Sequence, residues 1–393
     1  MTRTFIVSSA RTPIGKLSGS LASFSGADLG GLAIAAALQR AGLAPADVDH
    51  VIMGQVLQAG AGQNPARQAA VAGGIPMSVP AVTVNKVCLS GLYSLYLADQ
   101  MIRSGQADVV VAGGMESMTN APYLLPGARA GYRLGNAALA DGLIRDGLWC
   151  AFDDVHMGAA TDRYAADSGV ARRDQDEFAA WSHDRAATAA KEGRLDAEIV
   201  SVEVPQRKGA PVLVETDEGI RPGTTADSLA RLKPAFSPEG TITAGNASQL
   251  SDGGAAVVLV SEAKLAEAGL VGRAELVGYG MVAGPDPSLL TQPSAAIARA
   301  LHLAGLTTTD VDLFEINEAF AAVALTSMND LRISPAVVNI NGGAIALGHP
   351  VGMSGTRLVI TMVEELNRRG GGLGAVALCG GGGQGDAALL RVG

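Results

Sequence analysis

The sequence predicts an α/β protein built from two halves that follow one plan. Segments typical of strands and of helices alternate along the 393 residues, a pattern that predicts parallel sheets with helices on their faces. The chain is 48% hydrophobic and 17% charged, so it can bury one large core or two fused ones. The third observation is an internal repeat that relates the N-terminal part of the chain to the C-terminal part.

The N-terminal part shows the alternation of strands and helices most clearly. We expect a strand at 5–8, an Ala/Leu-rich helix at 27–41 and a second strand at 51–56. Residues 109–112 are expected to form a buried strand that ends in a glycine turn. The glycine-rich stretch 60–65 has a proline in place of the third glycine of a dinucleotide fingerprint, so it is predicted to be a turn.

The repeat relates residues 37–49 to residues 300–312, with eight identities in thirteen positions at a constant offset of 263. Similar offsets relate Ser90-Gly91 to Ser354-Gly355 and Gly113-Gly114 to Gly380-Gly381. A duplication in an α/β chain predicts two similar sheets packed through shared helices, with a site where matching element ends meet.

The segment between the halves, roughly 115–246, has a different character. It contains an Arg/Asp-rich helix at 172–191, an alternating charged strand at 199–204, and turns rich in Pro, Gly and Thr from 207 to 240. Such a segment is expected to fold on top of the core and to bind substrate. The alternative is a solvated insertion without a ligand.

Cys88 lies between a predicted strand, 81–87, and a helix that begins at Leu89 and is apolar on nearly every face. A thiol at the start of a helix is close to unpaired backbone N–H groups and to the positive end of the helix dipole, and both favour the thiolate. The small pair Ser90-Gly91 lets a substrate or another backbone approach the sulfur. Cys88 is therefore a candidate nucleophile, and the alternative is an inert core cysteine.

Composition excludes several other classes of protein. The net charge of −9 argues against nucleic acid or an anionic membrane as the main partner. Three cysteines without paired spacing predict no disulfide framework, and five histidines without ligand spacing predict no metal site. The N-terminus is typical of a first strand rather than a targeting segment, and no apolar run approaches membrane-spanning length. We therefore expect a protein of the reducing cytoplasm.

Four ordered motifs give the chain a resemblance to a known family. They are Asn85-Lys-Val-Cys88-x-Ser-Gly91, Asn317-Glu-Ala-Phe320-Ala, Asn341-Gly-Gly-Ala-Ile-Ala-x-Gly-His349-Pro350-x-Gly352-x-Ser-Gly355 and Cys379-x-Gly381-Gly-Gly383. With these motifs the chain resembles the thiolases, or acetyl-CoA C-acetyltransferases, nearly from end to end.

The resemblance implies a duplicated thiolase fold, a five-layered αβαβα core with two mixed sheets and an inserted loop domain. The implied domains are an N-terminal half (1–117 plus 247–270) with Cys88, a CoA-binding loop domain (118–246), and a C-terminal half (271–393) with His349 and Cys379. The implied assembly is a homodimer or a homotetramer.

The implied activity is the reversible Claisen condensation of two acetyl-CoA to acetoacetyl-CoA and CoA, in fatty acid metabolism. By resemblance, Cys88 is the nucleophile that forms an acyl-enzyme, and His349 accepts its proton and binds the acyl oxygen. Cys379 removes a proton from the α-carbon of the second acetyl-CoA. The N–H groups of Cys88 and Gly381 bind one oxyanion, and Asn317 positions a water at the other.

The same residues also have simpler interpretations. His349 could be structural, although the flanking Gly348 and Pro350 favour a fixed turn that faces a ligand. The glycines 380–383 could form only a tight turn between strands, and Asn317 could be a helix N-cap.

Coenzyme A is expected as part of the substrate, with no permanently bound cofactor. Positions that resemble the family's CoA contacts include Arg221, which suits a phosphate or the adenine face. The chain departs from the common pattern at Leu89, Cys150, Gln249, Ser251, Met353 and 286–293, which leaves the acyl-chain preference open. The full set of expected CoA contacts is Leu148, His156, Met157, Arg221, Ser228, Ala244, Ser248, Ala319 and Phe320.

Three functions follow from these considerations. The first is a short-chain thiolase, and the second is a degradative 3-ketoacyl-CoA thiolase for longer chains. The third is a non-catalytic acyl-CoA-binding protein, which the joint presence of Cys88, His349 and Cys379 disfavours. A fold-related ketoacyl synthase is expected to have two histidines, or His and Asn, instead of the second cysteine.

Overall fold

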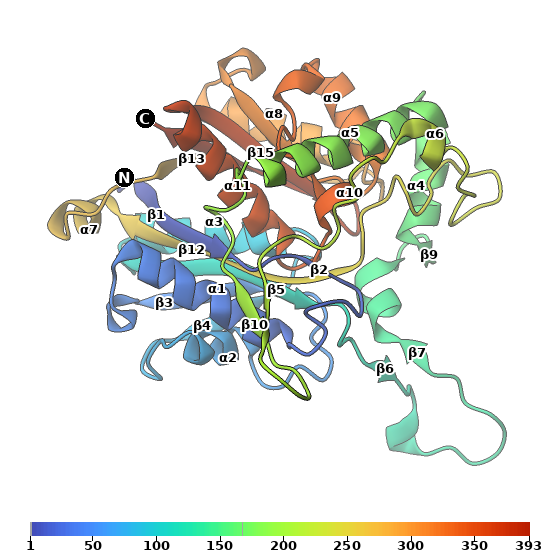
Figure 1. Cartoon of the computed structure of the whole chain (residues 1–393), viewed down its shortest axis with the longest axis horizontal. Helices are drawn as coiled ribbons and strands as arrows, with labels where there is room; N and C mark the ends of the chain where they lie inside the picture. Colours follow the sequence, from blue (N-terminus) through green and yellow to red (C-terminus); the bar gives the residue numbers. More distant parts are fainter. Residues whose placement is uncertain (1, 167) are drawn as a thin grey trace.

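The computed structural model describes residues 2–166 and 168–393. Its largest sheet has ten strands (Figure 1). They are β1 (Thr4–Arg11), β2 (Gly15–Lys16), β3 (His50–Gly54), β4 (Ala81–Val84), β5 (Val109–Ser117), β12 (Ser251–Ser261), β13 (Ala274–Ala283), β14 (Leu313–Ile316), β15 (Gly372–Gly380) and β16 (Gln384–Val392). The strand order is β14-β15-β16-β13-β1-β12-β5-β3-β4, and β2 pairs with β12 outside this path.

The two predicted sheets are the two ends of this path, and a short ladder joins them. Only Phe5 with Glu275 and Ile6 with Ala274 pair between β1 and β13. Elsewhere β1 pairs with β12, and β13 pairs with β16, along most of their length. The hydrogen bonds therefore connect the two predicted sheets into one path at a narrow seam.

Both parts of the sheet are mixed, so the expectation of parallel sheets from the alternating pattern was wrong for several strands. β3 pairs in parallel with β4 and β5, and β14 with β15. β15 and β16 are antiparallel because a short glycine turn joins them, whereas parallel neighbours need a long crossover. β12 is antiparallel to β1 and β5, because the chain enters it from the inserted segment rather than from a crossover helix.

Helices complete five layers around these strands, which confirms the expected architecture (Figure 1). α1 (Gly26–Ala41) and α2 (Pro65–Ala72) cover the outer face of the N-terminal part of the sheet. α8 (Gln292–Ala304) and α9 (Ala321–Leu331) lie over the outer face of the C-terminal part. Between the two parts lie α3 (Ser90–Arg103) and α11 (Ser354–Arg369), within the central core.

The repeated sequence folds into the same elements twice. In both copies a helix, α1 or α8, ends at a glycine in the left-handed region, Gly42 with φ of 67° or Gly305 with φ of 69°. A single 3₁₀ turn follows, at Pro45–Asp47 or Thr308–Asp310, and the chain then enters β3 or β14. Glycine suits these helix ends because it adopts positive φ without steric cost.

The duplicated Ser-Gly pairs meet where α3 crosses α11. A Cβ added to Gly91 would lie 2.8 Å from the carbonyl oxygen of Gly352, and one added to Gly355 would collide with the backbone nitrogen of Leu92. The Thr356 hydroxyl donates to the Gly91 carbonyl at 3.0 Å. The two helices therefore approach at backbone distance because both halves have glycine at this position.

The segment 118–246 runs from β5 to β12. The predicted helix at 172–191 is confirmed as α5 (Arg172–Lys191), and the predicted strand at 199–204 is shorter, β10 (Val202–Val204), paired with β11 (Val212–Val214). A long arm projects from the body between β6 (Tyr123–Leu124) and β7 (Ala140–Asp141) (Figure 1). Its other elements are the 3₁₀ turn Ala128–Ala130, the π-helix Ile144–Leu148, β8 (Trp149–Cys150), β9 (Val155–His156), α4 (Met157–Ala166) and α6 (Ala226–Leu229).

The remaining elements outside this segment are short. They are α7 (Glu262–Glu267), α10 (Ala344–Leu347) and the 3₁₀ turn Pro335–Val337. Among the residues that the structure describes, none of the helices has the length and hydropathy needed to cross a membrane.

Candidate active site

Residues 85–89 form a tight turn between β4 and α3 that presents Cys88. The predicted strand ends at Val84 rather than Val87, because Val87 adopts a left-handed conformation with φ of 52°. This conformation is strained for a β-branched residue and needs support from its surroundings. The Asn85 side chain accepts a hydrogen bond from Val87 N at 2.9 Å, and the Ser90 hydroxyl donates to the Val87 carbonyl at 2.6 Å.

Cys88 is 4% exposed, and burial raises the pKa of its thiol to about 12. The backbone N–H groups of Cys88 itself and of Gly381 lower this pKa, but desolvation outweighs them. The expectation that the helix start favours the thiolate was therefore wrong for the free protein. Cys88 is a thiol at neutral pH, and it needs a base to become a nucleophile.

Cys379 comes to the same place from the other half, near the end of β15. The hairpin after it approaches the Cys88 turn closely, since a Cβ on Gly380 would lie 2.6 Å from Leu89 Cγ and one on Gly381 would lie 3.2 Å from Val87 Cγ1. Cys379 is 1% exposed, and both its burial and the nearby charge of Cys88 raise the pKa of its thiol. The structure therefore brings the two cysteines within electrostatic reach of each other.

The β15–β16 turn also has the simpler role considered for its glycines. Gly382 and Gly383 have φ of 80° and 67°, and they close the hairpin between Gly380 and Gln384. The glycine run is thus a tight turn between strands, and it also presents the N–H of Gly381 to the sulfur of Cys88.

His349 is buried at the turn before α11 and makes two contacts. Its Nδ1 lies 2.6 Å from the Ser354 hydroxyl, and its Nε2 lies 3.4 Å from Asn317 Nδ2. Burial and the positive charge of Arg357 lower the pKa of His349 to about 3. The imidazole is therefore neutral at physiological pH and can accept a proton.

Asn317 follows β14, with its backbone N–H donating to the Ala377 carbonyl at 2.9 Å. The N-cap of the next helix, α9, is Phe320, so the alternative role of Asn317 as a helix cap was wrong. The side-chain oxygen Oδ1 of Asn317 is buried and has no hydrogen-bond partner among the described residues. A buried amide oxygen without a partner is suited to a water or a ligand atom.

Glu116 is a site residue that the sequence reasoning missed. Its fully buried carboxylate accepts hydrogen bonds from Val56 N at 2.9 Å, Leu57 N at 3.1 Å and Gly352 N at 3.0 Å. It therefore ties the end of β3 to the turn that carries His349. Burial raises the pKa of Glu116 to about 7, and its charge raises the pKa of Cys88. The available signal was a single acidic residue within an otherwise apolar strand.

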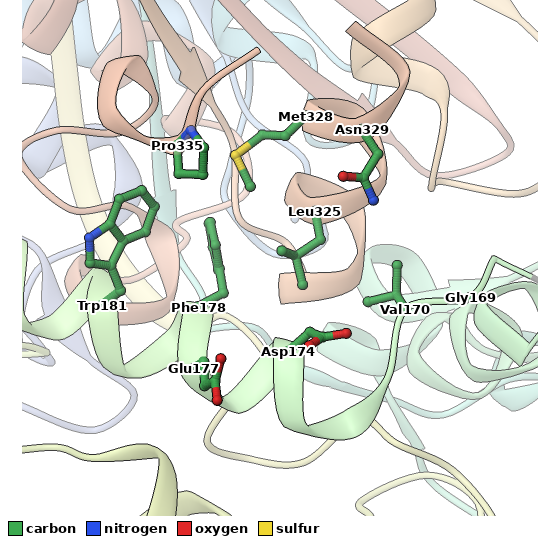
Figure 2. A pocket seen from close by; sticks show the side chains of 10 residues that line it. All are labelled: Gly169, Val170, Asp174, Glu177, Phe178, Trp181, Leu325, Met328, Asn329 and Pro335. Carbon is green, nitrogen blue, oxygen red and sulfur yellow. The ribbon is translucent and has the colours of Figure 1, made fainter. Parts of the chain in front are cut away.

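A cavity of about 590 Å³ opens beside Val87 and Gly381. The departures noted in the sequence include Cys150, which lines this cavity with the predicted CoA contact Met157. A separate cavity of about 600 Å³ lies between α5 and α9, where Phe178, Leu325 and their neighbours surround it (Figure 2). None of the predicted catalytic or CoA residues lines the second cavity, so the first one is the candidate substrate site.

The structure brings several of the predicted CoA contacts together. Met157, Ala319 and Phe320 belong to one apolar cluster with Cys379. The ring of Phe236 connects His156, at 4.6 Å between centroids, to Phe320, at 6.2 Å.

The other predicted CoA contacts are not members of the apolar cluster that contains Cys379. Ser248 N donates to the Ala319 carbonyl at 3.0 Å, and Ala244 is exposed in the loop before it. Leu148 packs instead against the central core. Arg221 N donates to His183 Nδ1 at 3.2 Å, and Ser228 takes part in the capping of α6.

No group of three or more His, Cys, Asp or Glu side chains with a geometry that could hold a metal ion is found in residues 2–166 and 168–393. The acid–base groups of the site are thus two thiols, one imidazole and the Glu116 carboxyl. A neutral imidazole, two buried thiols and the unpartnered amide oxygen of Asn317 are groups that can support acyl transfer.

Comparison with known proteins finds two family models along the chain. "Thiolase, N-terminal domain" matches residues 4–263, and "Thiolase, C-terminal domain" matches residues 270–392. The chain is 56% identical over 386 residues to the "Probable acetyl-CoA acetyltransferase" of Mycolicibacterium smegmatis, covering 98% of this chain and 100% of the relative. It is 54% identical to that of Mycobacterium tuberculosis and 51% identical to the "Acetyl-CoA acetyltransferase" of Cupriavidus necator, each over 100% of both chains.

Proposed function

This chain belongs to the thiolase family, and we propose that it is an acetyl-CoA C-acetyltransferase that works through an acyl-Cys88 intermediate. The reaction is the reversible condensation of two acetyl-CoA to acetoacetyl-CoA and CoA. Full-length identity to relatives named acetyl-CoA acetyltransferase supports this activity. The observation that supports the assignment of residues is the close approach of the Cys379 hairpin to the Cys88 turn, from opposite halves: a Cβ on Gly380 would lie 2.6 Å from Leu89 Cγ, and one on Gly381 would lie 3.2 Å from Val87 Cγ1.

In the first half-reaction, Cys88 Sγ attacks the carbonyl carbon of acetyl-CoA. His349 Nε2 accepts the thiol proton and returns it to the departing CoA sulfur, so that an acetyl thioester forms on Cys88 and free CoA leaves. The neutral state of His349 supports this role, because an uncharged imidazole has a free electron pair for the proton. The high pKa of Cys88 means that proton transfer accompanies the attack.

In the second half-reaction, the Cys379 thiol first passes its proton to the neutral His349 ring, which later gives it to the departing Cys88 sulfur. The Cys379 thiolate then removes a proton from the α-carbon of a second acetyl-CoA. The resulting carbanion attacks the carbonyl carbon of acetyl-Cys88, a carbon–carbon bond forms, and the Cys88 sulfur leaves. The close approach of the hairpin to the Cys88 turn supports this division of work, because the two cysteines must act on adjacent carbon atoms.

Two groups of donors support the developing negative charge on oxygen. The backbone N–H groups of Cys88 and Gly381 both lower the pKa of the Cys88 thiol, which supports the proposal that they donate to the acyl-enzyme oxyanion. His349 lies beside Asn317, whose free Oδ1 supports the proposal that it holds a water for the second oxyanion.

We propose that the acyl group is small and lies in the narrow space next to Gly381, outside the larger cavity of about 590 Å³. Cys150, Met157, Tyr164 and Leu289 close around a space of only about 10 Å³ next to Gly381. A longer acyl chain would have to displace these side chains, which supports acetyl-CoA over the 3-ketoacyl-CoA substrates of a degradative enzyme. CoA itself is proposed to lie along Met157, Phe320 and Ser248, with the phosphates toward Arg221.

We also propose a homodimer or homotetramer in the cytoplasm, with the domains 1–117 plus 247–270, 118–246 and 271–393. Apolar side chains on the projecting arm support association, since Tyr123 is 65% exposed and Leu134 is 100% exposed. β4 ends the strand order and has one edge unpaired, so it is a second candidate interface. Three free cysteines suit a reducing compartment.

Steady-state thiolysis of 3-ketoacyl-CoA substrates with four to sixteen carbons tests the proposed activity. We expect kcat/KM to be highest for acetoacetyl-CoA and to fall as the chain lengthens. A maximum at eight carbons or more would favour the degradative enzyme, and no turnover of any substrate would favour a non-catalytic binding protein. Light scattering of the purified chain measures the oligomeric state.

A further inference from the structure

We propose that the ion pair between Lys86 and Asp386 holds the Cys88 turn and the Cys379 hairpin in register, which makes both of them positioning residues for the reaction. The roles assigned to the two cysteines rest on the proposed function. The geometry of the ion pair does not depend on it.

The contacts of the pair are well formed. Lys86 Nζ lies 2.7 Å from Asp386 Oδ1 and 2.9 Å from Oδ2, and the Tyr279 hydroxyl donates to Oδ2 at 2.9 Å. The carboxylate is fully buried, and the lysine side chain is 17% exposed. Both oxygens of Asp386 therefore have charged or polar donors.

Each partner is attached rigidly to one catalytic cysteine. Lys86 lies two residues before Cys88, and its N–H donates to the Ser90 hydroxyl at 2.8 Å while its carbonyl accepts from Leu89 N at 3.2 Å. Asp386 lies on β16 directly opposite Leu378, the residue before Cys379. A bond between these two side chains therefore constrains the Cys88 turn relative to the strand that carries Cys379.

Aromatic rings shield the pair from water. Lys86 Nζ lies 4.8 Å from the centre of the Tyr93 ring, within the range of a cation–π contact. Tyr96 packs between Tyr93, at 5.6 Å, and Tyr279, at 4.7 Å. Exclusion of water strengthens an electrostatic contact, so this pair is a stiffer link than an exposed one.

The position of the Cys379 hairpin relative to the Cys88 turn, which the ion pair maintains, tolerates only small displacements. Gly381 N–H must reach the Cys88 sulfur, and Gly380 has room beside Leu89 only because it lacks a Cβ. Reacting groups lose much of their effectiveness when they move by about 1 Å. Neither Lys86 nor Asp386 lines the 590 Å³ substrate cavity, so their effect on the reaction has to pass through the turn and the hairpin.

The test replaces the ion pair with an apolar pair in Lys86→Met/Asp386→Leu. Replacing both charges avoids leaving a buried carboxylate without a partner. Two rates are measured on the full chain: alkylation of Cys88 by iodoacetamide at pH 8, followed on the Cys88 peptide by mass spectrometry, and single-turnover acetylation of Cys88 by acetyl-CoA. The first rate reports the Gly381 hydrogen bond to the sulfur and requires no catalytic activity.

We expect alkylation of Cys88 to slow by about threefold to tenfold, because loss of the Gly381 N–H raises the pKa of the thiol and reduces the thiolate fraction. Acetylation is expected to slow by about 10- to 100-fold. Glu116 and Cys379, the other ionisable groups that act on Cys88, are unchanged in this variant. Lys86→Arg keeps a positive charge opposite Asp386 and is expected to slow both rates less than Lys86→Met/Asp386→Leu does, although the larger guanidinium does not reproduce the geometry of the ammonium at this bidentate, stacked site.

Two further variants separate positioning from stability. Arg273→Met/Glu364→Leu removes a comparable pair, with a contact of 2.8 Å between Nη2 and Oε2, that joins the residue before β13 to α11. It is expected to leave both rates unchanged. If Lys86→Met/Asp386→Leu does not fold, Lys86→Gln takes its place, with an intermediate slowing expected because a neutral donor remains.

Wild-type rates in a folded Lys86→Met/Asp386→Leu or Lys86→Gln variant would overturn the proposal, as would equal slowing in the Arg273→Met/Glu364→Leu control. If the wild type fails to form acetyl-Cys88, the proposed function is wrong. The alkylation rates still test the positioning of the turn in that case.

Discussion

His349 and Ser354 are joined by a hydrogen bond of 2.6 Å between Nδ1 and Oγ. The Ser354 hydroxyl also donates to the Pro350 carbonyl at 3.0 Å, so its oxygen is left to accept the proton on Nδ1. This arrangement sets the tautomer in which Nε2 has the free electron pair, on the side of Asn317. Because Ser354 is the duplicated counterpart of Ser90, one repeated serine supports the nucleophile turn and the other supports the base.

The pKa of His349 predicts an unusual pH dependence of acetylation. Burial and Arg357 lower this pKa from 6.5 to about 3, so the neutral base persists from pH 8 down to about pH 4. Acetylation of Cys88 should therefore show no transition near pH 6.5, where an ordinary histidine would cost about 30-fold by pH 5. Single-turnover acetylation from pH 5 to 8 checks this in wild type and in Glu116→Gln, because the Glu116 carboxyl has a pKa of about 7 and acts on Cys88. A clear midpoint between pH 6 and 7 that persists in Glu116→Gln would contradict it.

Substitution His349→Ala should slow acetylation by about 10²–10⁴-fold, the usual effect of removing a positioned acid–base group. Exogenous imidazole is expected to restore part of the rate. The control is His302→Ala, which alters a solvent-facing residue of the last turn of α8 and should behave as wild type. A His349→Ala rate within threefold of wild type would mean that this histidine is structural.

Substitution Cys88→Ala should abolish acyl transfer, because no other sulfur lies in the turn between β4 and α3. Mass spectrometry of the wild type after mixing with acetyl-CoA should find one acetyl group, on the Cys88 peptide. Cys150→Ala tests the other cysteine that lines the substrate cavity, and this variant should still take the label on Cys88. A first label on Cys150 or Cys379 would refute the assignment of the nucleophile.

Substitution Cys379→Ser should separate the two half-reactions. Acetylation of Cys88 needs the nucleophile, His349 and the oxyanion donors, and these are unchanged. Removal of the α-proton needs a thiolate, which a serine hydroxyl cannot replace near neutral pH. We expect acetyl-enzyme to form at near the wild-type rate and acetoacetyl-CoA to be absent. Near-normal condensation, or a folded variant that does not acetylate, would argue against this division of roles.

Substitution Gly91→Val should destabilise the fold, because its Cβ would lie 2.8 Å from the Gly352 carbonyl oxygen at the crossing of α3 and α11. Overpacking of this kind costs about 1–3 kcal/mol in free energy of unfolding, and the backbone here has little freedom to move. Urea denaturation measures the loss. Ala35→Val, on the exposed face of α1, is the control and should cost well under 1 kcal/mol.

Much of the fold was predictable because the duplication is visible as identical residues at a constant spacing in the sequence. The repeat at 37–49 and 300–312 codes for the same helix end, 3₁₀ turn and strand in both halves, and α5 has the predicted bounds. Local pattern was less reliable for pairing direction, since β12 and β16 are antiparallel to their neighbours. Pairing direction depends on how the chain returns to the sheet, which no short window of sequence contains.

By itself, the sequence determined the family, the two-half plan and the residues proposed for the chemistry. The order and spacing of the motifs can be recognised in the sequence without a structure. Only the tertiary structure decided their state and their partners. Burial makes Cys88 a thiol and keeps His349 neutral, because desolvation depends on every residue packed around a group. Likewise, the link from Lys86 to Asp386 and the role of Glu116 arise from long-range packing of the two halves, which brings together groups that are far apart in the chain.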